Sequence, residues 1–220
     1  KTAIPVLRDA KMAKASGGLF MLKQTITTLN EFEGSALLKE AGIPVIEGIL
    51  VHDEPGARAA ADRLGFPVAL KICSGAVPHK TERGGVMLSI QDSASLGKVF
   101  GGMKKNFSDV PHAFLVQKMA RPGTELILGV RRDPIFGPVV LAGIGGIFTE
   151  IFRDTVIDLA PVDEEAALAM LRRLKGFALF NGYRLQEPLD IEAIAASIEA
   201  LSRLIAGRPD ILEIDVNPFI

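Results

Sequence analysis

The stretch AFLVQKMARPGTELILGVRRDPIFGPVVLAG, residues 113–143, contains three strand-like runs in close succession. Each run is rich in apolar and β-branched residues, and turns containing Pro-Gly and Asp-Pro separate them. Connections this short favour antiparallel neighbours, because a parallel pair needs a crossover of about a dozen residues or more. The stretch therefore predicts antiparallel pairing and a fold of the α+β class, not a regular parallel βαβ repeat.

Helices flank this stretch, and capping residues mark three of them. Asn30, with Glu33 three residues on, begins a helix that ends at Gly42, while Asp163 and Asp190 begin two more. Weaker helical patterns cover 54–64 and 93–105. Further strands are predicted at 46–51, 67–73, 85–90 and 211–216. The first 25 residues differ in character and indicate a short strand followed by a helix-like run.

Composition excludes several classes of protein. The 25 basic and 26 acidic residues give a net charge of −1, so no bulk attraction to nucleic acid or anionic lipid is expected. The longest apolar stretch, 138–148, is too short and too glycine-rich to span a bilayer. The single cysteine, Cys73, excludes an internal disulfide and fits a reducing compartment. No secretory signal opens the chain, so we expect a cytoplasmic protein.

Lys71 lies in the predicted strand PVALKIC, residues 67–73. Alternation places it on one face with Ala69 and Cys73, and Val68, Leu70 and Ile72 on the other. Since its neighbours are small and apolar, a lysine on that face is costly unless it meets an anion. A lysine that extends from an edge strand into solvent is an equally good interpretation of the spacing.

The final strand, ILEIDVNPF, carries a row of oxygen donors. Glu213, Asp215 and Asn217 share one face, and apolar residues share the other. Oxygen donors of this kind suit Mg²⁺. A solvated outer face that ends in an Asn-Pro turn explains the pattern at least as well.

Two loops contain residues suited to binding phosphate. In GIGGIFTE, residues 143–150, closely spaced glycines allow backbone N–H groups to converge on an anion, although most such segments are tight turns. In VPHKTERGGV, residues 77–86, the neutral imidazole of His79 is a competent phosphoryl acceptor beside Lys80 and Arg83. An exposed polar loop is the simpler interpretation of this segment. His52 and His112 lack comparable neighbours, and Cys73 is interpreted as a core residue.

Taken together, these segments resemble one family. In order they are LNEFEGSALLKEAGIPV, PVALKI, VPHKTERGGVML, the stretch from FLVQKM to FRD, and EIDVNPFI. The set is similar to the ATP-grasp domain of NDP-forming acyl-CoA synthetases, the β part of ADP-forming acetyl-CoA synthetase, and more distantly to the β subunit of succinyl-CoA synthetase. The resemblance runs from about residue 27 to the C-terminus. Glu82 departs from the family's pattern, which usually has aspartate there.

The resemblance implies an ATP-grasp fold, in which two α+β lobes clamp a nucleotide. The smaller lobe is expected at about 47–113, and the larger at 27–46 with 114–220. Residues 1–26 resemble the end of a preceding CoA-ligase region. The family has a further strand after the Asn-Pro whose aspartate completes the magnesium site, so we expect this chain to be part of a larger enzyme.

Residue roles also follow from the resemblance. His79, Lys80 and Glu150 match catalytic positions, with His79 as a phosphate relay. Asp215 and Asn217 match the magnesium motif. The nucleotide-binding positions are matched by Lys71, which touches phosphates; by the hinge Gln117, Lys118 and Met119, whose backbone reads adenine; and by Glu125, Gly145 and Gly146. The chemistry of the loop 77–86 adds Arg83, which can neutralise a phosphate, and Gly84, whose N–H can donate to one.

The implied function is that of an acid–thiol ligase. It exchanges phosphate between a phosphohistidine and ADP during acid + CoA + ATP ⇌ acyl-CoA + ADP + Pi, with ATP or ADP and Mg²⁺. The partner would be a CoA-binding region, on the same chain or in a separate α subunit, and the full enzyme is expected to be oligomeric. Two alternatives stay open: a non-catalytic ATP-grasp module that senses a ligand and regulates a fused acetyltransferase, and a scaffold that binds only its partner region.

Overall fold

The computed structural model describes residues 2–14, 20–75, 77, 80–146, 153–182 and 187–220. The chain divides into two compact units. The larger comprises residues 1–29, 37–43 and 123–220, and the smaller comprises 30–36 and 44–122. Helix α1 (Glu31–Glu40) contributes its first residues to the smaller unit and its last residues to the larger.

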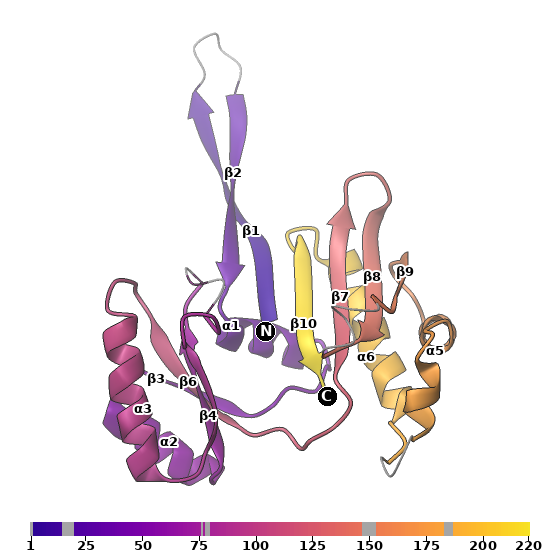
Figure 1. Cartoon of the computed structure of the whole chain (residues 1–220). Coiled ribbons are helices and arrows are strands. Elements are labelled where there is room, and N and C mark those ends of the chain that lie inside the picture. The colour runs from indigo at the N-terminus through magenta and orange to yellow at the C-terminus, as the bar shows by residue number, and fades with distance from the viewer. Residues whose placement is uncertain (1, 15–19, 76, 78–79, 147–152, 183–186) are drawn as a thin grey trace. The chain divides into compact units, whose positions relative to one another are not determined.

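The smaller unit is built on a four-stranded antiparallel sheet (Figure 1). Helices α2 (Glu54–Leu64) and α3 (Ser93–Asn106) contact its strands and each other. In order across the sheet, the strands are β3 (Gly48–Val51), β6 (Ala113–Lys118), β4 (Val68–Cys73) and β5 (Val86–Ile90).

The core of the smaller unit confirms the predicted alternation in β4. Val68, Leu70 and Ile72 are completely buried and belong to one apolar cluster with Leu96 and Phe100 of α3. The opposite face of β4 carries Ala69, Lys71 and Cys73. This second face is therefore the one that can present a charged side chain.

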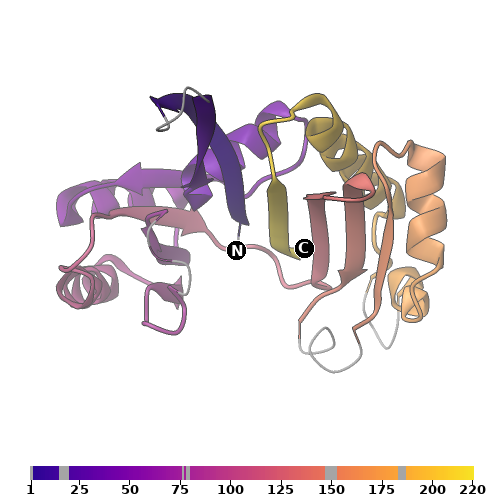
Figure 2. The same ribbon diagram turned by 90° about the horizontal axis from the view of Figure 1, so that it is seen from above.

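The larger unit is built on a six-stranded sheet. Helices α5 (Glu164–Arg172) and α6 (Ile191–Gly207) lie along the same side of it (Figure 2), and α6 contacts β7 and β8. A short 3₁₀ helix, η1, covers Phe177–Asn181. In order, the strands are β2 (Phe20–Leu29), β1 (Thr2–Lys14), β10 (Glu213–Phe219), β7 (Leu126–Asp133), β8 (Gly137–Ile144) and β9 (Thr155–Leu159).

Arg132 on β7 connects the end of α6 to the sheet. Its guanidinium donates to the carbonyl oxygens of Ile205, Arg208 (2.9 Å) and Ile211 (3.1 Å). The last carbonyls of a helix have no intrahelical partner, and a cation near them also complements the helix dipole. This contact fixes where the chain leaves α6 and enters β10.

The predicted helix starts are confirmed. Asn30 Oδ1 accepts the Glu33 N–H at 3.0 Å, and Glu33 Oε2 accepts the Asn30 N–H at 3.0 Å, which together form a capping box. Asp163 and Asp190 accept N–H groups three residues on, each at 2.9 Å. The α+β class is confirmed as well, since both sheets are antiparallel and helices pack on each.

Four points about the elements differ from the expectations. Strands β7 and β8 pair as predicted, but β6 pairs with β3 and β4 in the other sheet. The smaller unit consequently extends to Pro122 and not only to about 113. Residues 2–14 and 20–29 form a hairpin and contain no helix, and β9 was not predicted.

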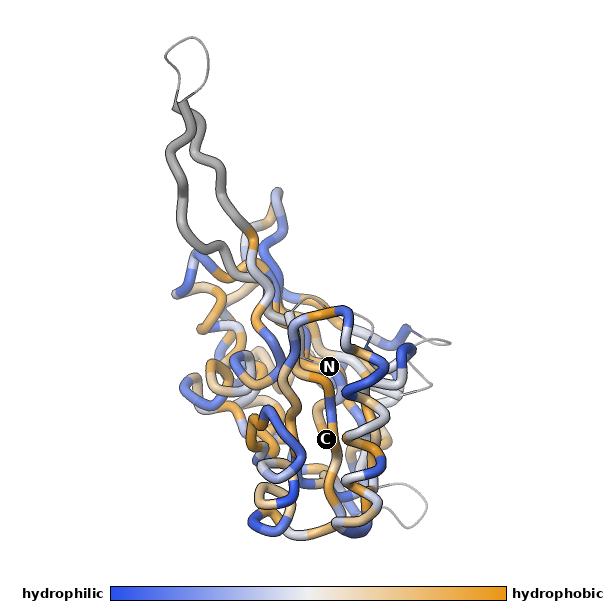
Figure 3. Tube along the Cα trace, turned by 90° about the vertical axis from the view of Figure 1, so that its left-hand side faces the viewer, coloured by the Kyte–Doolittle hydropathy of each residue, from blue (hydrophilic) through white to orange (hydrophobic). Residues whose placement is uncertain are grey.

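Hydrophobic and hydrophilic residues both occur along each helix, as expected for helices with one buried side (Figure 3). Among the described residues, no helix is both long and apolar enough to cross a membrane.

Candidate functional site

Lys71 and Lys80 meet the same carboxylate in the smaller unit. Lys71 Nζ lies 2.6 Å from Glu31 Oε1 and 2.7 Å from Gln117 Oε1. Lys80 Nζ donates to Glu31 Oε2. Glu31 and Lys80 are each 9% exposed and Gln117 is 8% exposed. The sequence left open whether Lys71 meets an anion or extends into solvent. In the structure, Lys71 meets the carboxylate of Glu31.

Local structure explains why these side chains converge. Lys71 pairs with Leu115 and Ala69 pairs with Gln117 in the antiparallel β4–β6 ladder, so Lys71 and Gln117 are diagonal neighbours on one face. Glu31 is the first residue of α1, directly after its cap Asn30. Asn30 Oδ1 also lies 3.2 Å from Cys73 Sγ, on the same face of β4 as Lys71.

The two ammonium groups control the ionisation of Glu31. Burial alone would raise the pKa of this carboxyl, but the charges and hydrogen bonds of Lys71 and Lys80 outweigh it and lower the pKa to about 2. At neutral pH the cluster thus contains one carboxylate and two lysines. Burial raises the pKa of the Cys73 thiol, which agrees with its interpretation as a core residue and not a nucleophile.

We expect Glu31 to make the protein sensitive to acid. Because its pKa is lower in the folded protein than the ordinary 4.5, its contribution to the free energy of unfolding is complete above pH 4.5 and is lost as the pH falls towards 2. The contribution is at most about 3 kcal/mol, since one pKa unit corresponds to about 1.4 kcal/mol. Urea unfolding at pH 5 and pH 3 measures it.

The matched control is Glu33→Gln, which removes an acid from the same helix turn and keeps a side chain suited to the capping box. Glu31→Gln should lower the free energy of unfolding at pH 5 and flatten its decline towards pH 3, while Glu33→Gln should retain the wild-type decline. An equally steep decline in Glu31→Gln would show that other carboxylates cause the acid sensitivity.

The segment after His79 is a closed turn. His79 itself lies outside the described residues, as does Glu150. Gly85 N–H donates to Lys80 O at 2.6 Å, and Gly84 N–H donates to Thr81 O at 3.1 Å. A Cβ on Gly85 would lie 2.8 Å from Lys80 O, and Gly84 has a φ of +71°, so both positions require glycine. These N–H groups close the turn, and the prediction that Gly84 helps to bind phosphate has no support from this geometry.

Arg83 is occupied elsewhere in the smaller unit. Its guanidinium lies 3.1 Å from Asp109 Oδ1 and 3.3 Å from Asn106 O, and it stacks over the Phe107 ring at 4.6 Å. The prediction that Arg83 binds phosphate is therefore not supported, because the side chain is held at the C-terminal end of α3.

In the predicted hinge, Gln117 makes contacts with its side chain as well as with its backbone. Gln117 holds Lys71, and its backbone lies in the centre of the sheet, opposite Gly48 and Ala69. Lys118 N–H donates to Glu47 O at 3.0 Å. Met119 Sδ lies 3.4 Å from Ser89 N. Adenine recognition by the backbone of these three residues stays a prediction.

In the larger unit, the glycine loop lies against Glu125. Gly145 N–H donates to Glu125 O at 2.6 Å, and a Cβ on Gly145 would lie 2.8 Å from that carbonyl. Gly146 has a φ of +68°, and Glu125 Oε2 lies 3.4 Å from where its Cβ would be. The loop therefore turns sharply beside the Glu125 carboxylate.

The oxygen donors of β10 share one face, as predicted. Ile214 and Val216 are buried, Glu213 is exposed, and Asp215 and Asn217 are half-buried. Carboxylate and amide oxygens in this setting fit a hard cation such as Mg²⁺. In the part of the chain that the structure describes, no three His, Cys, Asp or Glu side chains gather in a group that could hold a metal ion.

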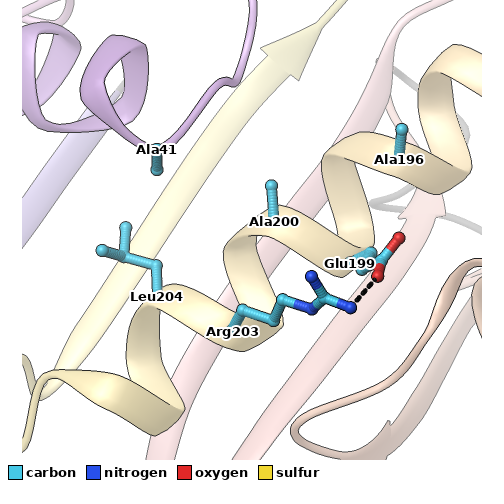
Figure 4. A pocket seen from close by; sticks show the side chains of 6 residues that line it. All are labelled: Ala41, Ala196, Glu199, Ala200, Arg203 and Leu204. Carbon is cyan, nitrogen blue, oxygen red and sulfur yellow. Dashed lines mark ion pairs between the residues drawn. The ribbon is translucent and has the colours of Figure 1, made fainter.

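A pocket of about 430 Å³ lies in the larger unit, and its lining includes none of the predicted site residues (Figure 4). Ala41 follows α1, and the other lining residues belong to α6, where Arg203 forms an ion pair with Glu199 at 2.5 Å. The lining is Ala41, Ala196, Glu199, Ala200, Arg203 and Leu204. It contains small apolar groups and one neutralised pair, which gives it no evident chemistry.

Comparisons with known proteins agree with the geometry. A family model described as an ATP-grasp domain matches residues 21–220. The β subunit of acetate–CoA ligase (ADP-forming) I of Pyrococcus furiosus is 36% identical over 213 residues, which cover 94% of this chain and 92% of the relative. Acetate–CoA ligase (ADP-forming) I of Archaeoglobus fulgidus is 37% identical over 191 residues, but these cover only 28% of that longer protein.

Solved structures extend the comparison. Acetyl-coenzyme A synthetase 1 of Ca. Korarchaeum cryptofilum, in complex with coenzyme A and Ca-AMPCP, has a TM-score of 0.84 and 39% identity, over 88% of this chain and 87% of that one. In another complex of that protein, with Mg-AMPPCP, the phosphohistidine segment points towards the nucleotide binding site; the TM-score is 0.75, with 38% identity over 86% and 84% of the two chains. The chain therefore belongs to the ATP-grasp family, in the group of β subunits and corresponding domains of ADP-forming acyl-CoA ligases.

Proposed function

We propose that this chain binds ATP and ADP with Mg²⁺ and exchanges phosphate between a phosphohistidine and ADP during acid + CoA + ATP ⇌ acyl-CoA + ADP + Pi. The observation that carries the proposal is the partly buried cluster of Lys71 and Lys80 around Glu31, which gives the smaller unit a site with a net positive charge. Phosphate groups are the natural ligands of paired, partly buried ammonium groups.

His79 is the residue that we propose to carry the phosphoryl group. Its neutral imidazole would accept phosphate from ATP, releasing ADP, and return it in the reverse direction. Lys80 follows it directly in the sequence and would neutralise the charge of the transferred group. Phosphoryl transfer needs little more from the protein than position and charge neutralisation.

The larger unit would supply the metal and a phosphate-facing loop. Mg²⁺ held by Asp215 and Asn217 would neutralise phosphate charge when bound. The turn at Gly145 and Gly146 would bring Glu125 and the transferring phosphate together, with Glu150 as a further catalytic residue. This assignment is supported by the contact between Gly145 and Glu125 and by the shared face of β10.

The acyl and CoA chemistry would belong to a CoA-binding partner region, in a separate α subunit or in the same polypeptide. Both arrangements are consistent with relatives, since one is named as a β subunit and another is a much longer chain. We further propose that the complete enzyme is oligomeric and works in the cytoplasm.

Loss of the Lys71 charge tests this function. We expect Lys71→Met to weaken MgADP binding about 10- to 100-fold, because a hydrogen bond to a charged group contributes roughly 1.5–3 kcal/mol and 1.4 kcal/mol is a factor of ten. Isothermal titration of MgADP into the wild-type protein and the variant measures the change.

Lys98→Met is the matched control, since Lys98 is an exposed lysine on α3 in the same unit. It should bind MgADP as tightly as the wild-type protein. Failure of the wild-type protein to bind MgADP or MgATP would refute the proposed function, and unchanged affinity in Lys71→Met would remove Lys71 from the site.

A further inference from the structure

Glu31 is an acidic residue in the centre of a site proposed to bind phosphate. It matches no predicted position, yet both of its oxygens are in use: Oε1 accepts from Lys71 at 2.6 Å, and Oε2 accepts from Lys80. These lysines lie 40 and 49 residues further along the chain. An anion here either competes with phosphate or arranges the lysines that bind it.

The contacts of Glu31 favour the second possibility, in which its carboxylate arranges the two lysines. Glu31 follows the cap of α1, and the N–H groups of Phe32 and Glu33 anchor Asn30 at 3.0 Å each, so the carboxylate is attached to a fixed point of the backbone. Lys71 is held from a second side by Gln117 at 2.7 Å. Two of the three N–H donors of the Lys71 ammonium are thereby directed at protein atoms, and the direction of the third is set.

Charge leads to the same conclusion. Two ammonium groups that share a buried site repel one another and lose hydration, and a single carboxylate bridging them offsets both costs. One negative charge against two positive charges leaves the site cationic. A dianionic phosphate can then bind without displacing Glu31, because the lysines retain donors for it.

We propose that Glu31 is a positioning residue for nucleotide phosphates: by bridging Lys71 and Lys80, it holds both ammonium groups where the phosphates of ATP or ADP meet them. The proposal rests on the proposed nucleotide-binding function. It assigns Glu31 no contact with the nucleotide and no step in phosphoryl transfer. Its effect should appear only with ligands that carry phosphate.

The experiment compares adenosine with MgADP. Glu31→Gln should weaken MgADP binding about 10-fold or more, because misplaced binding groups lose most of their contribution. Its affinity for adenosine should match that of the wild-type protein, since adenosine has no phosphate to meet the lysines. Glu33→Gln, two residues on in the same helix turn, should leave both affinities unchanged.

A second measurement needs no nucleotide. Ammonium protons that are held in hydrogen bonds exchange slowly with water, so ¹⁵N-labelled Lys71 and Lys80 should give sharp side-chain NMR signals in the wild-type protein, assigned with Lys71→Met and Lys80→Met. Both signals should broaden or vanish in Glu31→Gln. Should that variant fail to fold, Glu31→Asp keeps the charge on a side chain one methylene shorter, and it should lose at least one of the two signals and bind MgADP more weakly.

The outcomes separate the two proposals. Wild-type protein that binds no MgADP would refute the nucleotide-binding function, and with it the role of Glu31. If wild-type protein binds MgADP, tighter or unchanged binding in Glu31→Gln would refute the role of Glu31 alone and leave the function standing. A parallel loss of adenosine and MgADP affinity would also refute it, because it would show general damage to the site.

Discussion

His79→Ala is expected to abolish ATP formation from ADP, phosphate and acyl-CoA when the protein is assayed with its CoA-binding partner region. His79 is the proposed acceptor of the phosphoryl group, and loss of a nucleophile that forms a covalent intermediate typically costs about 10³-fold or more. Binding of MgADP should stay within about threefold of the wild-type value, since an alanine removes only the acceptor. Coupled assay of ATP and titration of MgADP measure the two effects separately.

His52→Ala provides the control, because His52 is an exposed histidine in the same unit. It should leave both turnover and MgADP binding unchanged. Unchanged turnover in His79→Ala would contradict the relay and would favour the alternative function, a ligand-sensing module without catalysis. Loss of MgADP binding together with turnover would place His79 in nucleotide binding and not in transfer.

The elements that could be predicted are those whose signals are local. Asn30, Asp163 and Asp190 mark helix starts because each cap bonds an N–H within three residues. Alternation along β4 predicted that Val68, Leu70 and Ile72 share one face, and all three belong to one apolar cluster, because side chains in a strand alternate strictly. Such signals need no knowledge of distant parts of the chain.

The elements that were missed depend on distant partners. A short connection favoured pairing of β6 with β7, but β6 lies between β3 and β4, which come from residues 48–51 and 68–73. Strand β9 is an edge strand with exposed Ile157 and Leu159, so its pattern lacks the usual contrast of buried and exposed residues. Helix-like residues in 2–14 pair with 20–29 instead, where the sheet overrides local propensity.

The residues of the candidate site also divide into those with a local sequence signal and those that depend on distant partners. One of the two equally good interpretations of Lys71 required an anion, but the sequence did not identify that anion, since Glu31 is 40 residues away. An acid just after an N-cap is expected for helix stability alone and gave no distinguishing signal. Arg83 and Gly84 were predicted as phosphate ligands by residue type, and their contacts with the turn and with the end of α3 could not be predicted because they depend on the fold. Residue type predicts what a side chain can bind, and packing decides what it does bind.

Gly145→Val is expected to disrupt the larger unit and, with it, phosphate chemistry. A Cβ at this position would lie 2.8 Å from both the carbonyl carbon and the carbonyl oxygen of Glu125, and backbone atoms cannot move aside as a flexible side chain does. The hydrogen bond from Gly145 N–H to Glu125 O, at 2.6 Å, would be strained or lost. We expect the free energy of unfolding to fall by about 3 kcal/mol or more.

The same change should also reach the site. Displacement of Glu125 and of the turn at Gly146 should reduce turnover by about 100-fold, as expected when reacting groups are misplaced by an ångström. Gly207→Ala is the control in the same unit, because no atom lies within 4 Å of a Cβ there, and it should be at least as stable to urea as the wild-type protein. Urea unfolding measures the loss of stability, and the coupled ATP assay measures the loss of turnover under conditions where the variant is folded. A Gly145→Val protein with wild-type stability and turnover would show that the loop does not need its close approach to Glu125, and the proposed phosphate-facing role of this glycine turn would then be wrong.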